Sequence, residues 1–159
     1  MKLHEIAFVL IFVWIFLVLA GCTQAQAPPP EVTQSPEPVN VSIVSDNPHY
    51  SLTWSSSPGM GLSPDIGGGG SGNNVSYHWK TDYGTFLSWT SPDYQVLTLG
   101  PDVVVTHPKV YWSYGVLSEG QSRPVVHISL ELIDSSTGAT LAYTTRTIRW
   151  AEGDLAEIQ

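Results

Sequence analysis

The sequence predicts an all-β fold built as an antiparallel β-sandwich, and three observations predict it. Short runs in which apolar and polar residues alternate recur between Val39 and Trp150, and Gly, Pro and Asp separate them. No stretch of this region repeats its apolar residues at the 3.6-residue period of a helix. Charged residues make up only 13% of the chain, whereas Trp and Tyr are frequent, which is typical of a folded β-rich domain. About eight such strands suit one sandwich domain.

Each alternating run has one apolar and one polar face, as in a strand that buries one side. The expected strands are residues 39–43, 50–54, 75–79, 110–116, 125–133 and 139–150, with weaker candidates at 85–89, 94–99 and 103–105. Trp54, Trp79 and Trp112 fall on the apolar phase of their runs, so we assign them to the core.

The last two strands are expected to form a hairpin, because the polar turn between them ends in Gly138, which adopts positive φ angles readily. The apolar phase of the second strand changes partway, so a bulge is expected near 144–146. The domain is predicted to span 39–150, and the tail at 151–159 to contain a turn of helix. Within the domain, the glycine-rich segment 55–74 is interpreted as a long loop.

The first residues predict export. Residues 6–20 are apolar, without charge, Pro or Gly. As a helix this run spans about 22 Å, which is shorter than the roughly 30 Å hydrocarbon core of a membrane. It ends at Leu19, Ala20, Gly21 and the only cysteine, Cys22. Residues 1–21 are therefore interpreted as a signal peptide.

This ending resembles the lipobox of bacterial lipoproteins, which implies cleavage before Cys22 and lipid on its thiol. The mature chain would then begin with the lipidated cysteine and a Pro-rich tether, residues 22–38, that holds the domain away from the membrane. Because Thr23 follows the cysteine, the resemblance implies the outer membrane in a diderm bacterium. In a monoderm bacterium it implies the outer face of the cell membrane. The alternative is an uncleaved anchor in which Cys22 is an incidental thiol.

The charge of the chain limits its partners. The formal net charge is −8 at pH 7. This acidic balance argues against nucleic acid as a partner and against electrostatic adhesion to anionic lipid. Attachment to the membrane is therefore expected through the lipid on Cys22.

One short segment carries a family resemblance. Tyr77, Trp79, Tyr83 and Gly84 stand in a Tyr-x-Trp strand that runs into an aromatic-Gly turn. This arrangement is similar to the central segment of PKD-type immunoglobulin-like domains, although Lys80 replaces an acidic residue that is usual there. The resemblance implies an immunoglobulin-like sandwich with a role in extracellular binding or spacing. It implies no catalytic residues.

Catalytic and metal-binding patterns are missing from the sequence. There is no Gly-x-Ser-x-Gly or His-Glu-x-x-His motif, so we expect no enzyme activity, cofactor or metal. His78 and His127 fall on the polar faces of their strands and would be neighbours if those strands pair, which is the one arrangement that suggests zinc. Asp93, Asp102 and Asp134 occur in turn contexts, where Asp caps backbone N–H groups.

Aromatic residues supply the best candidate site. Tyr83, Trp89, Tyr94 and Tyr111 have undetermined phases and form the candidate binding face. The sequence thus predicts a lipid-anchored, non-catalytic binding or accessory module of the bacterial cell envelope. The alternatives are a carbohydrate-binding or protein-inhibitory module that uses the aromatic face and, less favoured, an envelope hydrolase. A planar row of aromatic rings would favour glycan as the ligand.

Overall fold

The computed structural model describes residues 39–67, 74–90, 92–116 and 123–159. They all belong to one compact unit, Pro36–Gln159. The predicted signal peptide, Cys22 and the tether lie outside the described residues. No helix that is long and apolar enough to cross a membrane occurs within the described ranges.

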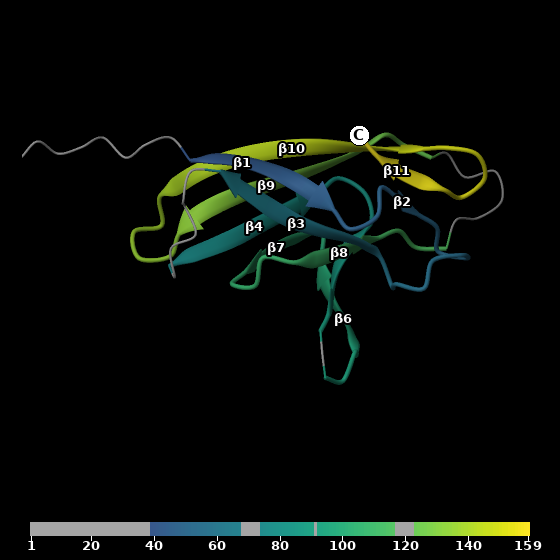
Figure 1. The fold of residues 1–159 in the computed structure, drawn as a ribbon, viewed down its shortest axis with the longest axis horizontal. Coiled ribbons are helices and arrows are strands. Elements are labelled where there is room, and N and C mark those ends of the chain that lie inside the picture. The colour runs from purple at the N-terminus through teal and green to yellow at the C-terminus, as the bar shows by residue number, and fades with distance from the viewer. Residues whose placement is uncertain (1–38, 68–73, 91, 117–122) are drawn as a thin grey trace, which may run out of the picture. The chain divides into compact units, whose positions relative to one another are not determined.

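Two antiparallel sheets form a sandwich-like arrangement, which confirms the predicted all-β fold and is consistent with an immunoglobulin-like β-sandwich (Figure 1). In order across the first sheet, the strands are β1 (Asn40–Ser45), β3 (Met60–Gly67), β8 (Val110–Ser113), β5 (Thr85–Trp89) and β6 (Val96–Gly100). In order across the second sheet, they are β2 (His49–Tyr50), β11 (Ala156–Ile158), β10 (Thr140–Trp150), β9 (Val126–Asp134), β4 (Val75–Thr81) and β7 (Asp102–Val105).

The core lies between the sheets and follows from the alternation of the strands. Strand β9 buries all four apolar residues of its inner face, Val126, Ile128, Leu130 and Leu132. The first sheet contributes Trp112 and the second contributes Trp79, and both side chains are fully buried, as predicted. Trp79 packs against Phe86 across the core, with ring centroids 6.0 Å apart. The two sheets are therefore joined by interlocking aromatic and aliphatic side chains.

The prediction of a long loop at 55–74 is wrong in part, because the described residues of this segment include strand β3. The strand lies between β1 and β8, and its Met60 and Leu62 are buried. At the start of the strand, a Cβ on Gly59 would lie 2.6 Å from the carbonyl oxygen of Trp112. The glycine thus lets two backbones approach closely, although glycine in a sequence usually indicates a loop. Residues 68–73, within the glycine-rich run, lie outside the described residues.

The assignment of Trp54 to the core is also wrong, since 86% of this residue is exposed. The strand expected at 50–54 ends at Tyr50, and a turn follows it. The strand expected at 110–116 ends at Ser113. In both cases the alternation of apolar and polar residues in the sequence continues beyond the last residue that pairs with a neighbouring strand.

The C-terminal region differs in two further respects. The tail forms strand β11 in place of the expected helical turn, and it pairs with β10 and β2. The irregularity in β10 lies between Thr140 and Ala142, whereas the register from Ala142 to Ile148 is continuous. The bulge predicted near 144–146 is therefore wrong. Leu141 and Tyr143 simply face solvent, so the strand needs no break to bury Ile148.

Candidate functional site

Three of the four predicted site aromatics meet at the hairpin formed by β5 and β6. Trp89 ends β5, Tyr94 lies in the following turn, and Tyr111 comes from the adjacent β8. The Trp89 ring centroid lies 5.4 Å from that of Tyr94 and 5.5 Å from that of Tyr111. We call these three residues the hairpin cluster. Tyr83 lies elsewhere and packs against Trp150 at 6.5 Å, so the structure does not bring it to this surface.

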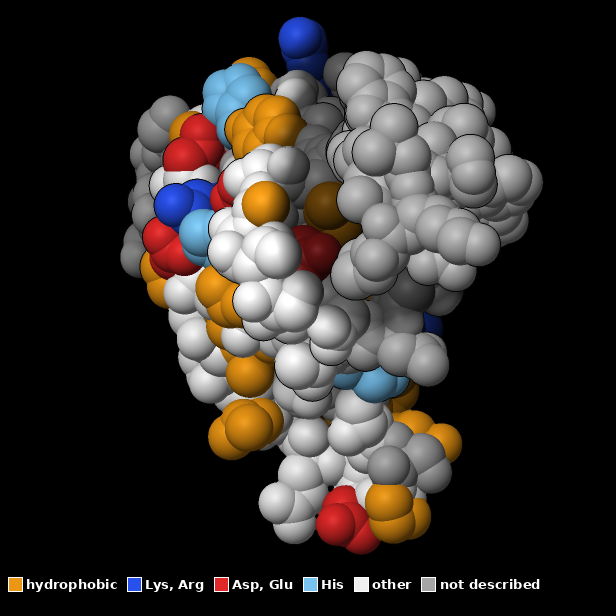
Figure 2. All heavy atoms as spheres, turned by 90° about the vertical axis from the view of Figure 1, so that its left-hand side faces the viewer, with side chains coloured by type: hydrophobic (Ala, Val, Ile, Leu, Met, Phe, Trp, Pro, Cys, Tyr) orange, Lys and Arg blue, Asp and Glu red, His pale blue; other side chains and the backbone are white. Residues whose placement is uncertain are grey.

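The hairpin projects from the body of the sandwich (Figure 1). Tyr94, Val96 and Leu97 are each more than half exposed. Figure 2 shows hydrophobic side chains gathered at this projecting end, at the bottom of the view. Soluble proteins seldom keep adjacent large apolar residues in water without a partner that covers them.

The geometry of the hairpin cluster bears on the kind of ligand. The Trp89 ring is inclined by 60° to the Tyr94 ring and by 78° to the Tyr111 ring, so the three rings form no planar row. Strand β6 ends the five-stranded sheet, and its only described neighbour is β5. The surface therefore combines aliphatic side chains with an open strand edge, which suits a polypeptide better than the flat face of a sugar.

A charged side chain, Lys109, packs against Tyr111 in the hairpin cluster. The Lys109 ammonium lies 5.2 Å from the centroid of the Tyr111 ring and forms an ion pair with Asp46. The hydrogen bond to Asp46 raises the pKa of Lys109, so this side chain stays cationic over Tyr111. Tyr111 is buried and provides the floor against which the Trp89 ring packs.

The two histidines considered for zinc are not neighbours. His78 on β4 lies opposite Glu131 of β9, and its ring bonds Glu131 at 3.2 Å and Asp102 at 2.7 Å. His127 bonds Asp82 at 2.7 Å. The hydrogen bond from His78 lowers the pKa of Asp102. In the part of the chain that the structure describes, no three His, Cys, Asp or Glu residues are placed to hold a metal ion.

The three turn acids have different roles. Asp134 accepts hydrogen bonds from the backbone N–H groups of Ser136 and Thr137 at 2.7 and 3.0 Å, as expected for a turn cap. Asp102 begins strand β7 and pairs with His78. Asp93 lies in the exposed turn of the β5–β6 hairpin.

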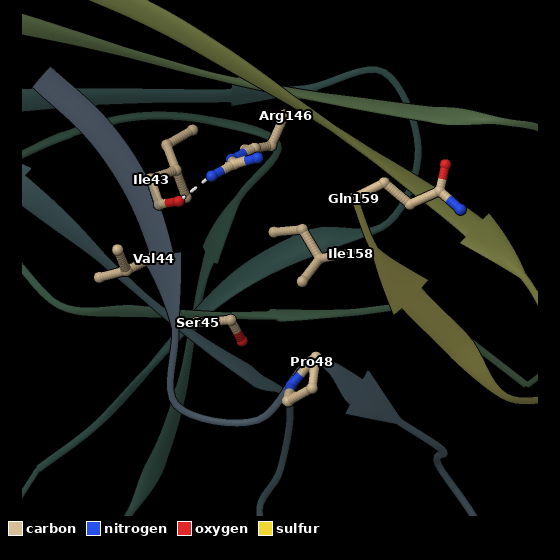
Figure 3. Close-up of a pocket in the computed structure, with 7 residues that line it drawn as sticks. All are labelled: Ile43, Val44, Ser45, Pro48, Arg146, Ile158 and Gln159. Carbon is tan, nitrogen blue, oxygen red and sulfur yellow. Dashed lines mark hydrogen bonds between the residues drawn. The ribbon is translucent and has the colours of Figure 1, made fainter.

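A cavity of about 290 Å³ lies between β1 of the first sheet and β10 and β11 of the second (Figure 3). The Arg146 side chain reaches across it from β10, and its Nε donates a hydrogen bond to the carbonyl oxygen of Ile43 at 3.2 Å. The other lining residues are mostly aliphatic or small. This arginine therefore ties the two sheets together, and the described lining residues include no set of polar groups that converge on a ligand.

Sequence reasoning missed one cleft, which is lined by the exposed Trp54. Its only signal in the sequence is that Ser and Thr surround this tryptophan, which is typical of a turn. No protein-family model, curated protein or solved structure matches the chain. Function is therefore inferred from the surfaces of the sandwich.

Proposed function

We propose that the chain is a lipid-anchored, non-catalytic binding module of the bacterial cell envelope, which binds a protein partner through the β5–β6 hairpin. The observation that carries this proposal is the exposure of three large apolar side chains on the projecting hairpin, Tyr94, Val96 and Leu97. The lipobox-like sequence before Cys22 and the Pro-rich tether support placement outside the cytoplasmic membrane.

The energetics favour a protein partner. Full burial of an exposed Val or Leu side chain contributes about 1.5–3 kcal/mol. Val96 and Leu97 are each a little more than half exposed, so covering either one contributes roughly half of that free energy. The open edge of β6 adds unpaired backbone groups that a strand of the partner can bond. Inclined rings lack the flat surface on which a sugar stacks, so glycan is the second candidate.

Capture of the partner tests the hairpin. The full chain, tagged at its C-terminus, is expressed in the producing bacterium, treated with a cleavable crosslinker and isolated from the envelope. Tyr94→Ser is expected to reduce the yield of the captured partner about tenfold or more, because an aromatic contact residue at an interface contributes 2 kcal/mol or more. Tyr143→Ser is the matched control, since Tyr143 is 63% exposed, Tyr94 is 57% exposed, and Tyr143 lies on the other sheet. Equal loss in both variants, or captured glycan without protein, would contradict the proposal.

Lipid attachment is tested separately by growth with radioactive palmitate. The wild-type chain is expected to take up label, and Cys22→Ser to take up none, because the thiol is the acceptor atom in the chemistry that a lipobox implies. Thr23→Ser keeps the cysteine and serves as the control. Label on the Cys22→Ser chain would refute the anchor while leaving the hairpin proposal intact.

A further inference from the structure

A second surface, remote in sequence from the hairpin, has the features of a ligand site. It is a cleft of about 450 Å³ between the turn at 51–55 and the loop that precedes β11, and small-molecule sites commonly have volumes in this range. The lining residues are Ser51, Trp54, Glu152, Gly153, Asp154 and Leu155. Trp54 is 86% exposed.

The turn holds Trp54 in water through a set of hydrogen bonds. The Ser55 N–H donates to the carbonyl oxygen of Ser51 at 3.0 Å, and the Trp54 N–H donates to Ser51 Oγ at 3.3 Å. Ser51 Oγ donates in turn to Asp154 Oδ2 at 2.8 Å, as Thr53 Oγ1 does at 3.0 Å. Five residues from two distant segments thus fix the turn. The exposed position of the Trp54 indole is therefore determined by the hydrogen bonds of the fold.

The buried Tyr114 stabilises the same turn through further hydrogen bonds. The Tyr114 hydroxyl donates to the carbonyl oxygen of Asp154 at 2.6 Å and accepts from the Leu52 N–H at 2.9 Å. Its ring packs edge-on against Trp150, with centroids 4.7 Å apart. The hydrogen bond from Ser51 lowers the pKa of Asp154, which keeps this carboxylate ionised at the edge of the cleft.

The polar lining of the cleft consists almost entirely of acceptors. The carboxylates of Glu152 and Asp154 accept hydrogen bonds and cannot donate when ionised. The Ser51 hydroxyl already donates to Asp154. The described lining residues include neither Lys nor Arg, so among them the Trp54 indole N–H is the one remaining side-chain donor. A sugar presents hydroxyls that both donate and accept, whereas an ammonium group only donates.

We propose that this cleft binds a primary ammonium group carried on an aliphatic body, as in a lysine side chain or a free alkylamine. The indole face of Trp54 attracts the cation and packs on its methylene groups, as in other cation–π sites. Glu152 and Asp154 accept the N–H bonds, and the net charge of −8 favours approach of a cation. This site is independent of the hairpin and goes beyond the proposed function.

The test follows the indole N–H signal of Trp54 by NMR in the mature full chain, with the signal assigned through Trp54→Phe. N-acetyl-lysine methylamide is titrated first, followed by N-acetyl-norleucine methylamide, which has the same aliphatic body without the ammonium group. We expect the lysine compound alone to shift the signal. Glu152→Gln is expected to weaken its binding about two- to fivefold, as loss of one exposed ion pair implies. Glu157→Gln is the matched control, because Glu157 lies on β11, where it pairs with His49.

Two results would overturn the proposal: equal shifts with the lysine and norleucine compounds, or a shift with methyl glucoside that Glu152→Gln leaves unchanged. A further titration with n-butylamine separates the sources of the ammonium group. Equal affinity for butylamine and the lysine compound supports a free amine as the ligand. Tighter binding of the lysine compound supports a side chain of a partner protein.

Discussion

Leu130→Ala is expected to lower the free energy of unfolding by about 2–5 kcal/mol, the range found when a buried leucine leaves a cavity. Leu130 is fully buried in β9, where it lies opposite Trp79 of β4 and Thr144 of β10. Strands surround the site on both sides, so the core has little freedom to close around the missing atoms. Urea unfolding followed by tryptophan fluorescence measures the change.

Leu97→Ala makes the same chemical change on the surface and serves as the control. Leu97 is 63% exposed on β6, so its truncation is expected to alter the free energy of unfolding by no more than about 0.5 kcal/mol. A loss at Leu97 as large as that at Leu130 would mean that the hairpin packs against the core, which contradicts its description as a projecting surface.

Gly84→Ala is expected to destabilise the domain by about 2–4 kcal/mol, since it combines two costs. Gly84 has a φ angle of 82°, which an alanine adopts with strain. A Cβ there would also lie 2.6 Å from the carbonyl oxygen of Ser113 and 2.8 Å from Trp112 Nε1. Neither atom can shift easily to make room for the added Cβ. Ser113 is held in β8, and the Trp112 indole donates a hydrogen bond to the carbonyl oxygen of Tyr83 at 2.8 Å.

Gly138→Ala separates these two costs. Gly138 has a similar φ angle of 73°, but a Cβ at this position meets no atom within 4 Å. Its replacement is therefore expected to cost only the backbone strain, about 1 kcal/mol. The difference between the two variants in thermal or urea unfolding measures the steric clash at Gly84. An equal decrease in the free energy of unfolding in both variants would show that the Cβ added at Gly84 does not clash with β8.

Local patterns predicted the central strands well. The alternation from Val126 to Leu132 set the inner face of β9, and the same reasoning placed Trp79 and Trp112 in the core. Burial alternates along β9, because this strand pairs with β4 and β10 over most of its length. The predicted hairpin at Gly138 also formed, because its turn is stabilised by adjacent residues.

Failures occurred where distant segments decide the outcome. Trp54 has the phase of a core residue, but the carboxylate of Asp154 bonds the turn that contains it and holds the indole outside. Strand β3 has the composition of a loop. Gly59, just before the strand, is explained only by the close approach of Trp112, and Gly61 within it by the close approach of Asp46. None of these contacts is visible in the local sequence.

For the candidate site, too, local sequence predicts some features and distant segments decide the others. Trp89 and Tyr94 are separated by one hairpin turn, so their proximity follows from local structure, and Tyr111 joins them because β8 pairs with β5. Tyr83 shares the aromatic character of these residues, but it packs against Trp150 from the far end of the chain. Leu97 follows Val96 and points to the opposite face of β6, and its exposure depends on β6 lying at a sheet edge.

The claim that the hairpin contacts a protein partner is tested most directly by photo-crosslinking in living cells. A photoreactive amino acid replaces Leu97 in the full chain, and in a second strain it replaces Leu141, an exposed leucine on the other sheet. On illumination we expect a discrete protein adduct from position 97 and none from position 141. Adducts of the same size and yield from both positions, or no protein adduct from position 97, would contradict the proposed binding surface.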